Sequence, residues 1–500
     1  MSEIVIGKHT LESLTSGMYS DPFVIYREYI QNSTDSIDDA IQNGILLGGE
    51  GKIEIYLNQI ERVIRIEDNG LGIPGQEAES TLINIGDSKK SSENSRGFRG
   101  IGRLSALSYC DELVFETSYK EEQIGTRFII NAKKLAELLS SEESDAITVG
   151  EVLQRVYHVE TFQESASKHY FRVILSKVSE SSGLLKRDDV ADYISQHAPV
   201  PYDQEQFKWG AEIEKRLKQE GYAIRHYNIL LNKGDHLVAV HKPYTDQFPI
   251  DKDQKTVDQI LDIQLVRFEL HNHTQALGWI AKTNCLGSIY EKSIKGIRLR
   301  KGNILIGDSQ TLNSVFKDPR FNGWCIGEIF AIGKKLIPNA RRDGFEKNTE
   351  YYFLHDQLTS LASNITKGIR NASLKRNAEL SKALKKSSAV KHEVEVVLQK
   401  DVLSGAEKGN VHQKLTSTIN ALSLSNVNSR ADEYFREIAF EELDILIGKL
   451  QGVTSYKAVN ILENLSNSEK KILERVFNVL VTVSPENANK LIEEILRSFL

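Results

Sequence analysis

The 500-residue chain has few cysteines, no large excess of either charge and no long hydrophobic run. Its three cysteines, Cys110, Cys285 and Cys325, are far apart and form no CxxC pair. This spacing excludes a disulfide framework and a zinc knuckle, and it fits a reducing cytosol. The formal net charge is -6, so no global basic field favours nucleic acid or an acidic membrane. Any such binding must come from a local segment.

Targeting and membrane-spanning segments are missing as well. No uninterrupted apolar stretch approaches the length that spans a bilayer, and the N-terminus lacks a basic stretch followed by an apolar run. We therefore expect a cytoplasmic protein that is neither exported nor embedded in a membrane. The Walker A sequence GxxxxGK[ST] does not occur, so a phosphate-binding loop of that type is excluded.

The length exceeds what one hydrophobic core usually holds. A polar segment with two prolines, residues 198–210, is the best candidate for a domain boundary. From Asn371 onward glycine and aromatic residues become rare and helical periodicity dominates. The predicted domains are residues 1–200, 201–375 and 376–500.

A helix is predicted between residues 21 and 43. Asp21 can cap its first turn, Pro22 suits the first helical position, and Gly44 can end it. At 3.6 residues per turn, one stripe is apolar. This stripe comprises Phe23, Tyr26, Ile30, Ile37 and Ile41.

The opposite side of this helix carries Glu28, Asn32 and Asp35. Taken alone, such a side is most often a solvated polar face. The alternative is that these groups face a ligand, and two further stretches favour it.

The first of these is VIRIEDNGLGIP, residues 63–74, preceded by the alternating KIEIYL. Together they predict a hairpin whose second strand ends at Asp68 and a tight turn with Gly70 and Gly72. Glycines at such a turn allow close approach of a flat ligand to the backbone, although an ordinary turn has the same pattern.

The second stretch is IGDSKKSSENSRGFRGIGRLSAL, residues 85–107. It is polar and rich in glycine and serine, and it leads into an apolar helical pattern. A flexible loop that enters a helix N-terminus offers N–H groups and a positive dipole end to a phosphate. A plain flexible loop remains the alternative.

In this order, the three motifs resemble the N, G1 and G2 boxes of the GHKL ATPases. That superfamily comprises gyrase, the ninety-kilodalton heat-shock chaperones, histidine kinases and MutL, with MORC ATPases as a further branch. The resemblance implies that the polar helix face binds Mg-ATP. Glu28 would be the general base that activates water, Asn32 would ligate Mg2+, and Asp35 would complete the polar face.

The same resemblance implies roles for the two glycine-containing stretches. Asp68 would accept a hydrogen bond from the adenine amino group, with Gly70 and Gly72 beside it. Residues 86–102 would form a lid over the phosphates. The lid residues assigned to the nucleotide are Lys89, Gly97, Gly100 and Gly102.

The predicted fold class is α+β. Alternating strands at residues 112–119, 125–132 and 170–178 suit the antiparallel sheet of an α/β sandwich. The resemblance implies a Bergerat ATP-binding fold here, a mixed antiparallel sheet with helices on one face. A second α/β domain and a helical C-terminal region would follow.

Residues 321–348 resemble the middle-domain segment of the ninety-kilodalton chaperones. Their Asn-x-x-Arg-acid turn matches Asn339, Arg342 and Asp343, so the resemblance implies that Arg342 contacts the γ-phosphate. The neighbouring Arg341 is the second choice. Gyrase and MutL use a lysine in this role, so Lys334 and Lys335 stay open as alternatives.

The sequence therefore predicts a Mg-dependent ATPase that acts as a nucleotide-gated, chaperone-like clamp. Expected partners are a second copy of the chain, through ATP-dependent N-terminal contact and the C-terminal helices, and a protein client. The alternative is a MORC- or MutL-like DNA-associated ATPase in genome maintenance or defence. In that case the locally basic segment 367–391 would contact nucleic acid.

Overall fold

The computed structural model describes Thr10 and residues 21–84, 102–141, 148–376, 378–399, 402–427, 430–456 and 465–498. The chain divides into two compact units. The first comprises residues 1–283 and 289–363, and the second comprises residues 284–288 and 364–500. The three-domain division at residues 200 and 375 stays a prediction.

Within the described residues, a mixed sheet of eight strands forms one part of the first unit, in the order β5-β4-β3-β6-β2-β1-β7-β8. All neighbouring pairs are antiparallel except β1 and β7, which are parallel. The strands are β1 (Lys52–Asn58), β2 (Val63–Asp68), β3 (Glu112–Ser118), β4 (Ile124–Asn131), β5 (Tyr157–Gln163), β6 (Tyr170–Ser176), β7 (Asn228–Lys233) and β8 (His236–Ala239).

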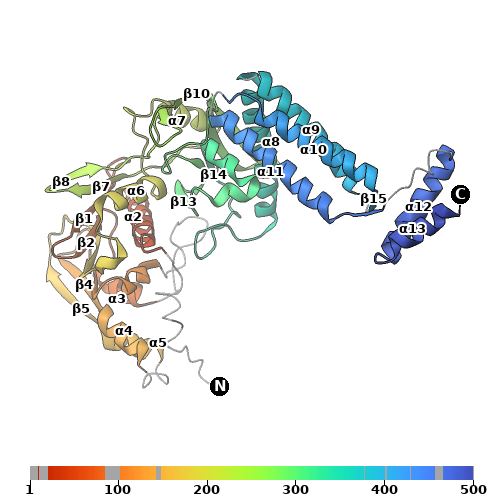
Figure 1. Cartoon of the computed structure of the whole chain (residues 1–500). Coiled ribbons are helices and arrows are strands. Elements are labelled where there is room, and N and C mark those ends of the chain that lie inside the picture. The colour runs from red at the N-terminus through yellow and green to blue at the C-terminus, as the bar shows by residue number, and fades with distance from the viewer. Residues whose placement is uncertain are drawn as a thin grey trace. The chain divides into compact units, whose positions relative to one another are not determined.

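Helices cover one face of this sheet (Figure 1). Alternate strand residues such as Ile53, Ile55, Ile64 and Ile66 are buried in the core beneath them, as period-two alternation requires. The helices are α2 (Val24–Gln42), α3 (Gly75–Ile83), α4 (Ala132–Ser140), α5 (Val149–Val156) and α6 (Arg187–His197), with 3-10 turns η1 (Gly102–Ser108) and η3 (Glu180–Ser182).

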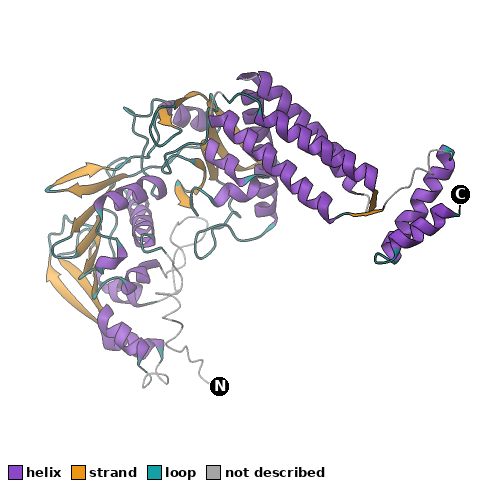
Figure 2. Cartoon of the chain, in the orientation of Figure 1, coloured by secondary structure: helices purple, strands orange, loops and turns teal. Residues whose placement is uncertain are grey.

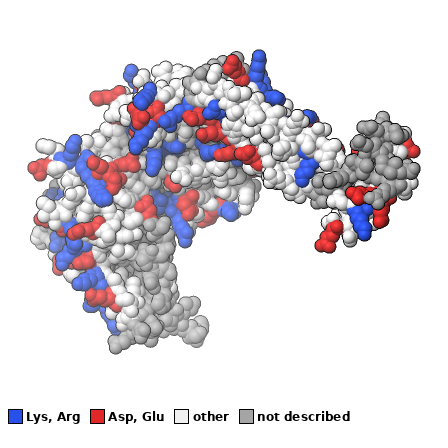
Figure 3. All heavy atoms as spheres, in the orientation of Figure 1, with Lys and Arg blue, Asp and Glu red and all other residues white. Residues whose placement is uncertain are grey.

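The other face of the sheet carries a row of paired charges. Arg172 on β6 bonds to Glu67 on β2 and to Glu116 on β3, and Arg127 on β4 bonds to the same Glu116. Opposite charges on neighbouring strands stabilise the pairing of a solvent-facing sheet surface. Over the face of the first unit that Figure 3 draws, Lys and Arg side chains are interspersed with Asp and Glu.

Strands β7 and β8 come from beyond residue 200, yet they extend the first sheet. Residues 52–55 of β1 pair in parallel with residues 228–231 of β7. The connection also contacts α2, because Tyr227 donates a 2.7 Å hydrogen bond to Asp38. The sheet predicted for residues 1–200 therefore includes strands from the next 40 residues of sequence.

A second sheet of the first unit has the order β13-β12-β14-β11-β10-β9 in the described residues. Its strands are β9 (Gln247–Pro249), β10 (Val257–Leu270), β11 (His273–Thr283), β12 (Gly296–Lys301), β13 (Ile304–Ile306) and β14 (Ile326–Ala331). The accompanying helical elements are α7 (Trp209–Gln219), η4 (Thr311–Val315), η5 (Pro319–Trp324) and the start of α8 (Thr349–Arg376).

A buried charged cluster joins the second sheet to the segments that lead to it. Glu328 on β14 is fully buried and accepts from Lys242 at 2.7 Å, from Tyr202 at 2.7 Å and from Arg300. Burial opposes the charge of Glu328, but Arg300 and Lys242 outweigh this effect and hold its pKa well below the usual range. Arg300 also donates to the backbone carbonyl of Gln196 at the end of α6, at 2.8 Å. This cluster ties α6, and the first sheet with it, to β12 and β14.

The second unit is mainly helical (Figure 2). Its core lies between three long helices, α9, α10 and α11, and a helical hairpin of α12 and α13 has a small core of its own. Ser404 and Ser466 form capping boxes with Glu407 and Glu469 at the starts of α10 and α12. The elements are α9 (Ala378–Leu398), β15 (Val402–Ser404), α10 (Gly405–Ser423), α11 (Arg430–Gly452), β16 (Thr454–Tyr456), α12 (Asn467–Val483) and α13 (Ala488–Arg497), together with the end of α8.

The predicted α+β class is confirmed: a mixed sheet covered by helices on one face, a second mixed sheet and a helical C-terminal region. Cys110 and Cys325 are buried and Cys285 is partly buried. Burial raises the pKa of the Cys110 thiol to about 12, which makes it unreactive. None of the helices in the described ranges combines the length and the apolar character needed to cross a bilayer.

Candidate active site

Helix α2 lies against the first sheet and is covered on both sides. Tyr26, Ile30 and Ile37 of the predicted apolar stripe are at most 1% exposed. Glu28 and Asp35 on the polar side are only 7% and 4% exposed. Charged residues are almost never buried without partners, so this side is not a solvated surface.

The ends of α2 follow from the local sequence. Asp21 Oδ1 accepts a 3.0 Å hydrogen bond from the backbone of Phe23, as expected for a residue that caps the first turn. At the other end, Gly44 has a left-handed φ of +69°. Such a conformation favours glycine and stops the helix after Gln42. The predicted helix is therefore present, with its regular part slightly shorter than residues 21–43.

Two arginines surround the carboxylate of Glu28. Arg27 Nη2 donates to Glu28 Oε1 at 3.1 Å, and Arg342 Nε lies 3.7 Å from the same oxygen. The three side chains are nearly buried, so their charges are screened much less than at a surface. The fold thus brings together the predicted base and the predicted phosphate-sensing arginine. Arg27 also donates to the backbone carbonyl of Arg341, at 3.3 Å.

The loop that carries Arg342 holds it in a tight conformation. Pro338 and Phe345 form an isolated β-bridge, and the side chains of Asn339 and Asp343 hydrogen-bond at 2.6 Å. Arg342 itself has a φ of +57°, in the left-handed region that non-glycine residues seldom adopt. Such a backbone persists only where its surroundings determine it, and functional sites are common among these places.

The other three candidates for the γ-phosphate sensor are placed differently. Arg341, Lys334 and Lys335 are exposed, whereas Arg342 is buried. Lys335 forms a 3.0 Å ion pair with Glu350 at the start of α8. The geometry therefore supports Arg342 over its neighbours.

Gly102 begins η1 directly against the predicted base. A Cβ atom at this position would lie 2.3 Å from Glu28 Oε2, closer than a real Cβ comes to another heavy atom. The absence of a side chain therefore makes room for the carboxylate. The next residue, Arg103, donates to the carbonyls of Thr81 and Asn84 at the end of α3. Its guanidinium anchors η1, and burial lowers its pKa.

The turn after β2 is packed against α2. Asp68 is 1% exposed, and its Oδ1 accepts from the backbone of Gly70 at 2.9 Å. A Cβ on Gly70 would lie 2.3 Å from Ser36 Oγ on α2, and one on Gly72 would lie 2.1 Å from the carbonyl of Ser118. Both glycines are thus required by contacts within the protein, whatever ligand binds beside them.

The structure describes only some of the remaining predicted site residues. Asn32 is partly exposed on the same side of α2 as Glu28. Most of the predicted lid, with Lys89, Gly97 and Gly100, lies outside the described residues. Sequence reasoning did not assign a role to Arg27, although its position next to Glu28 was a usable signal.

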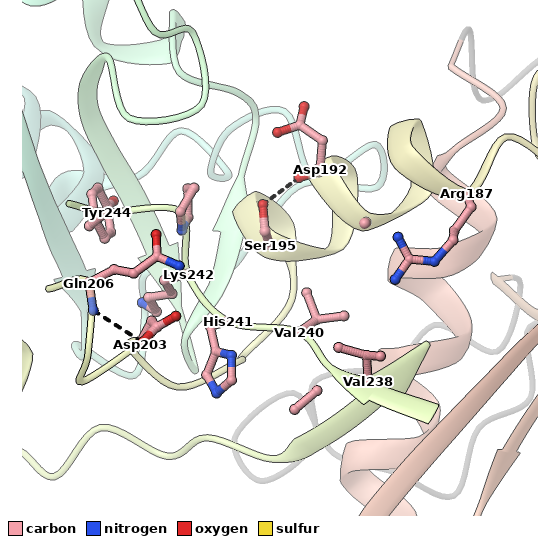
Figure 4. Close-up of a pocket in the computed structure, with 13 residues that line it drawn as sticks. Arg187, Asp192, Ser195, Asp203, Gln206, Val238, Val240, His241, Lys242 and Tyr244 are labelled. Atoms are coloured by element: carbon pink, nitrogen blue, oxygen red, sulfur yellow. Dashed lines mark hydrogen bonds between the residues drawn. The ribbon is translucent and has the colours of Figure 1, made fainter. Parts of the chain in front are cut away.

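A separate hollow of about 340 Å³ lies between α6 and the chain around β8 (Figure 4). Two hydrogen bonds connect residues of its lining: Ser195 Oγ donates to the carbonyl of Asp192 at 2.7 Å, and Asp203 accepts from the backbone of Gln206 at 3.2 Å. The ammonium of Lys242, which also lines it, is bound to Glu328. The lining of the hollow does not include Glu28, Arg27 or Arg342.

Comparison with known proteins supports the interpretation of the first sheet. Residues 19–158 match the family described as "Histidine kinase-, DNA gyrase B-, and HSP90-like ATPase". This segment is a GHKL-type ATPase domain. It contains Glu28, Asn32, Asp35, Asp68 and the predicted lid.

Its relatives include bacterial proteins named chaperone protein HtpG. The protein from Halalkalibacterium halodurans is 24% identical over 190 residues, 35% of this chain and 30% of that relative. Those from Legionella pneumophila (strain Lens) and Geobacter metallireducens are 33% and 34% identical over 87 and 84 residues, each covering 16% of this chain. The matches span 14% and 13% of these two relatives, so the chain corresponds to less than a third of each relative.

Proposed function

We propose that this chain is a Mg-dependent ATPase that works as a nucleotide-gated, chaperone-like clamp. The observation that carries the proposal is the contact between Arg342 and Glu28, 3.7 Å apart and nearly buried. It connects the GHKL-type domain to a loop that follows the second sheet. A signal at the nucleotide would reach the second sheet through this contact.

Asp68 and Asn32 have the chemistry that a nucleotide and its metal ion require. Asp68 is buried at the end of β2, and its second carboxylate oxygen can accept from an adenine amino group. Asn32 is accessible on the same side of α2 as Glu28, and its amide oxygen suits Mg2+, which keeps most of its ligands as water and phosphate. The described residues hold no group of three His, Cys, Asp or Glu that could form a metal site by themselves. Asn32 would hold the Mg2+ ion, and the ion's charge would offset the negative charge of the phosphates.

The catalytic step would use the two groups that contact each other in this structure. Glu28 would accept the proton of the attacking water as a general base. Arg342 would leave the Glu28 carboxylate and place its planar, permanently charged guanidinium against the γ-phosphate. The carboxylate would then be held by Arg27 alone. Arg342 can bind either Glu28 or the γ-phosphate, so two states are possible. Nucleotide would favour the closed state, in which Arg342 contacts the phosphate, because it binds that state more tightly.

The exposed apolar residues of the helical hairpin favour a second copy of the chain as a partner. On α12, Ile472, Val476, Val479 and Val483 are 62%, 39%, 60% and 77% exposed. Their spacing of four, three and four residues forms one apolar stripe along a helix, as in a coiled-coil seam. Two stripes of this kind in antiparallel arrangement would cover each other and form a C-terminal dimer contact.

An unfolded protein client and a cytoplasmic location complete the proposal, because the relatives carry the name of a chaperone. The DNA-associated alternative has one observation in its favour. Lys382, Lys385 and Lys386 are exposed on α9, within the basic segment 367–391. Stimulation of ATP turnover by an unfolded protein, compared with stimulation by DNA, separates the two functions.

Calorimetry and turnover test the central proposal. Titration of the full chain with ATP and Mg2+ should release or absorb heat, and ATP should be hydrolysed. Glu28→Gln should bind ATP with nearly unchanged affinity but lose turnover. Glu137→Gln, at an exposed position on α4, is the matched control and should behave as the parent chain. Absence of nucleotide binding would refute the proposal, and full turnover of Glu28→Gln would refute the assigned base.

A further inference from the structure

Gln31 on α2 has an amide that the fold leaves unused. The residue is 0% exposed, and neither its Nε2 nor its Oε1 has a hydrogen-bond partner in the part of the chain that the structure describes. Native proteins satisfy the large majority of their buried polar atoms, so an amide with both ends unpaired needs an explanation. A catalytic role is one of the recognised explanations.

The position of Gln31 on the helix places it in the candidate active site. Residues three and four apart on an α-helix are neighbours on one face, about 5–6 Å apart at Cβ. Gln31 is three residues after Glu28 and four before Asp35, and it is next to Asn32. Its amide therefore belongs to the same buried polar face of α2 as the proposed base.

The polar side chains of Arg27 and Thr34, near Gln31 on the helix, already have hydrogen-bond partners other than the Gln31 side-chain amide. Arg27, one turn earlier, donates to Glu28 and to the backbone carbonyl of Arg341. Thr34, one turn later, is fully buried and donates its hydroxyl to the carbonyl of Gln31 itself, at 2.8 Å. The side-chain amide of Gln31 thus differs from Arg27 and Thr34, whose side chains have hydrogen-bond partners.

We infer that Gln31 is a further catalytic residue that binds and orients the attacking water beside Glu28. The inference deepens the proposed ATPase function and depends on it. An amide suits this task because its C=O accepts from the water while its N–H donates to a phosphoryl oxygen, and glutamine side chains orient water in other phosphoryl-transfer enzymes. A carboxylate base without such a partner would hold the water by one hydrogen bond, which leaves the water free to rotate about that bond.

The reaction that this arrangement assists is balanced with water alone. The water oxygen forms a new bond to the γ-phosphorus, and one proton of that water passes to Glu28. The bond between the γ-phosphorus and the bridging oxygen breaks, and its electron pair stays with ADP. Gln31 keeps its own protons throughout.

Replacement of Gln31 by methionine tests the inference, because methionine has a similar shape without polar atoms. An unpaired buried amide destabilises the folded chain, so Gln31→Met should keep or raise the Tm by a few degrees. It should lower kcat at least about 10-fold while the KM for ATP stays within about threefold, since the water is positioned only for the chemical step.

Thr34→Val is the matched control on the same helix. It removes a hydroxyl with a known partner, so it should lower the Tm and leave kcat within about twofold. We expect the two variants to differ in opposite ways: Gln31→Met has an equal or higher Tm with lower turnover, and Thr34→Val has a lower Tm with normal turnover.

Three results would overturn the inference. A lowered Tm for Gln31→Met would mean that the amide already stabilises the fold. An unchanged kcat, with any Tm, would mean that the amide does not act in hydrolysis. A large rise in KM with constant kcat would assign it to nucleotide binding instead. Failure of the parent chain to bind or hydrolyse ATP would be a separate result that refutes the proposed function itself.

Discussion

Arg342 Nε lies 3.7 Å from Oε1 of Glu28, and both side chains are about nine-tenths buried. Glu28 comes from helix α2 beside the first sheet, and Arg342 comes from a loop that follows β14 of the second sheet. The two sheets of the first unit therefore meet at the proposed catalytic carboxylate.

We predict that Arg342→Ala lowers kcat by at least about 10-fold, because a buried arginine that meets developing phosphate charge contributes far more than one in water. Its exposed neighbour Arg341 touches Arg27 only through a carbonyl, so Arg341→Ala should stay within about twofold. Steady-state ATP turnover of both variants checks the prediction. Equal losses in the two variants would contradict the assignment and indicate a general effect on the loop.

Gly102→Ala should reduce turnover without unfolding the chain. The added Cβ would meet the end of the Glu28 side chain, which can move, and not the backbone. The carboxylate would then be displaced from its contact with Arg27 and Arg342, and a displacement of about 1 Å at a catalytic group can cost on the order of 100-fold in rate. Circular dichroism and turnover are the measurements.

Gly150→Ala provides the comparison for this substitution. Gly150 lies in α5, where a Cβ would come no closer than 4.0 Å to Thr148 Oγ1. Alanine is also the better helix former, so this variant should keep its turnover and gain slight stability. Normal turnover in Gly102→Ala would show that the carboxylate has room to move without loss.

Asp68→Asn should weaken ATP binding by about 10- to 100-fold, since a mispaired buried contact costs about 1–3 kcal/mol. The fold should survive, because the remaining amide oxygen can still accept from Gly70 N, as Oδ1 does now at 2.9 Å. Calorimetric titration with ATP measures the change. Asp188→Asn, with a side chain 97% exposed at the start of α6, should bind as the parent does. Unchanged affinity of Asp68→Asn would remove the adenine assignment.

The local parts of the GHKL-type domain could be predicted because each has its own signal. Helix α2 is bounded by Asp21 and Gly44, and the strand that ends at Asp68 shows clean alternation before its glycine turn. The helical period of 3.6 residues per turn also placed Glu28 and Asp35 on one side of α2. These signals act over a few residues, so they could be recognised from the sequence alone.

Contacts over long sequence distances could not be predicted in the same way. Nothing local in residues 228–233 states that they pair in parallel with β1, and nothing near Gln31 states that its side chain is fully buried. Both depend on which distant segments cover them. Family resemblance implied that Arg342 contacts the γ-phosphate, but only the structure showed its contact with Glu28.

Glu328→Gln should destabilise the first unit by about 3–5 kcal/mol, because removing one partner of a buried charge cluster leaves uncompensated charge. Lys242 and Arg300 would lose the carboxylate that both contact. All three tryptophans of the chain lie in the first unit, so their fluorescence during urea unfolding reports on that unit alone. Glu160→Gln, whose side chain is 51% exposed, should change stability by less than about 0.5 kcal/mol. A similar small change for Glu328→Gln would show that the cluster is not needed for stability.

His197 should make the first unit less stable in mild acid. Burial, followed by the positive charges of Arg27 and Arg300, lowers the pKa of His197 to about 3, and its ring stacks on Tyr193. Between pH 6.5 and pH 3 the unfolded chain binds a proton that the folded chain does not. The free energy of unfolding therefore falls as the pH decreases through this range, and the contribution of neutral His197 to stability is complete only above it.

The expected slope from His197 is about 1 kcal/mol per pH unit below pH 6, since one pKa unit corresponds to about 1.4 kcal/mol. Urea unfolding between pH 5.2 and 7.5, a range chosen to lie above most carboxyl titrations, would measure it, at about 25 °C. His197→Phe keeps an aromatic ring for the stack with Tyr193 but cannot titrate, so its slope should be smaller by about that amount. His236→Gln, at an exposed position on β8, should retain the parent slope. If His197→Phe keeps that slope as well, another group is responsible for the acid sensitivity, and the neutral histidine beside Arg27 does not limit stability.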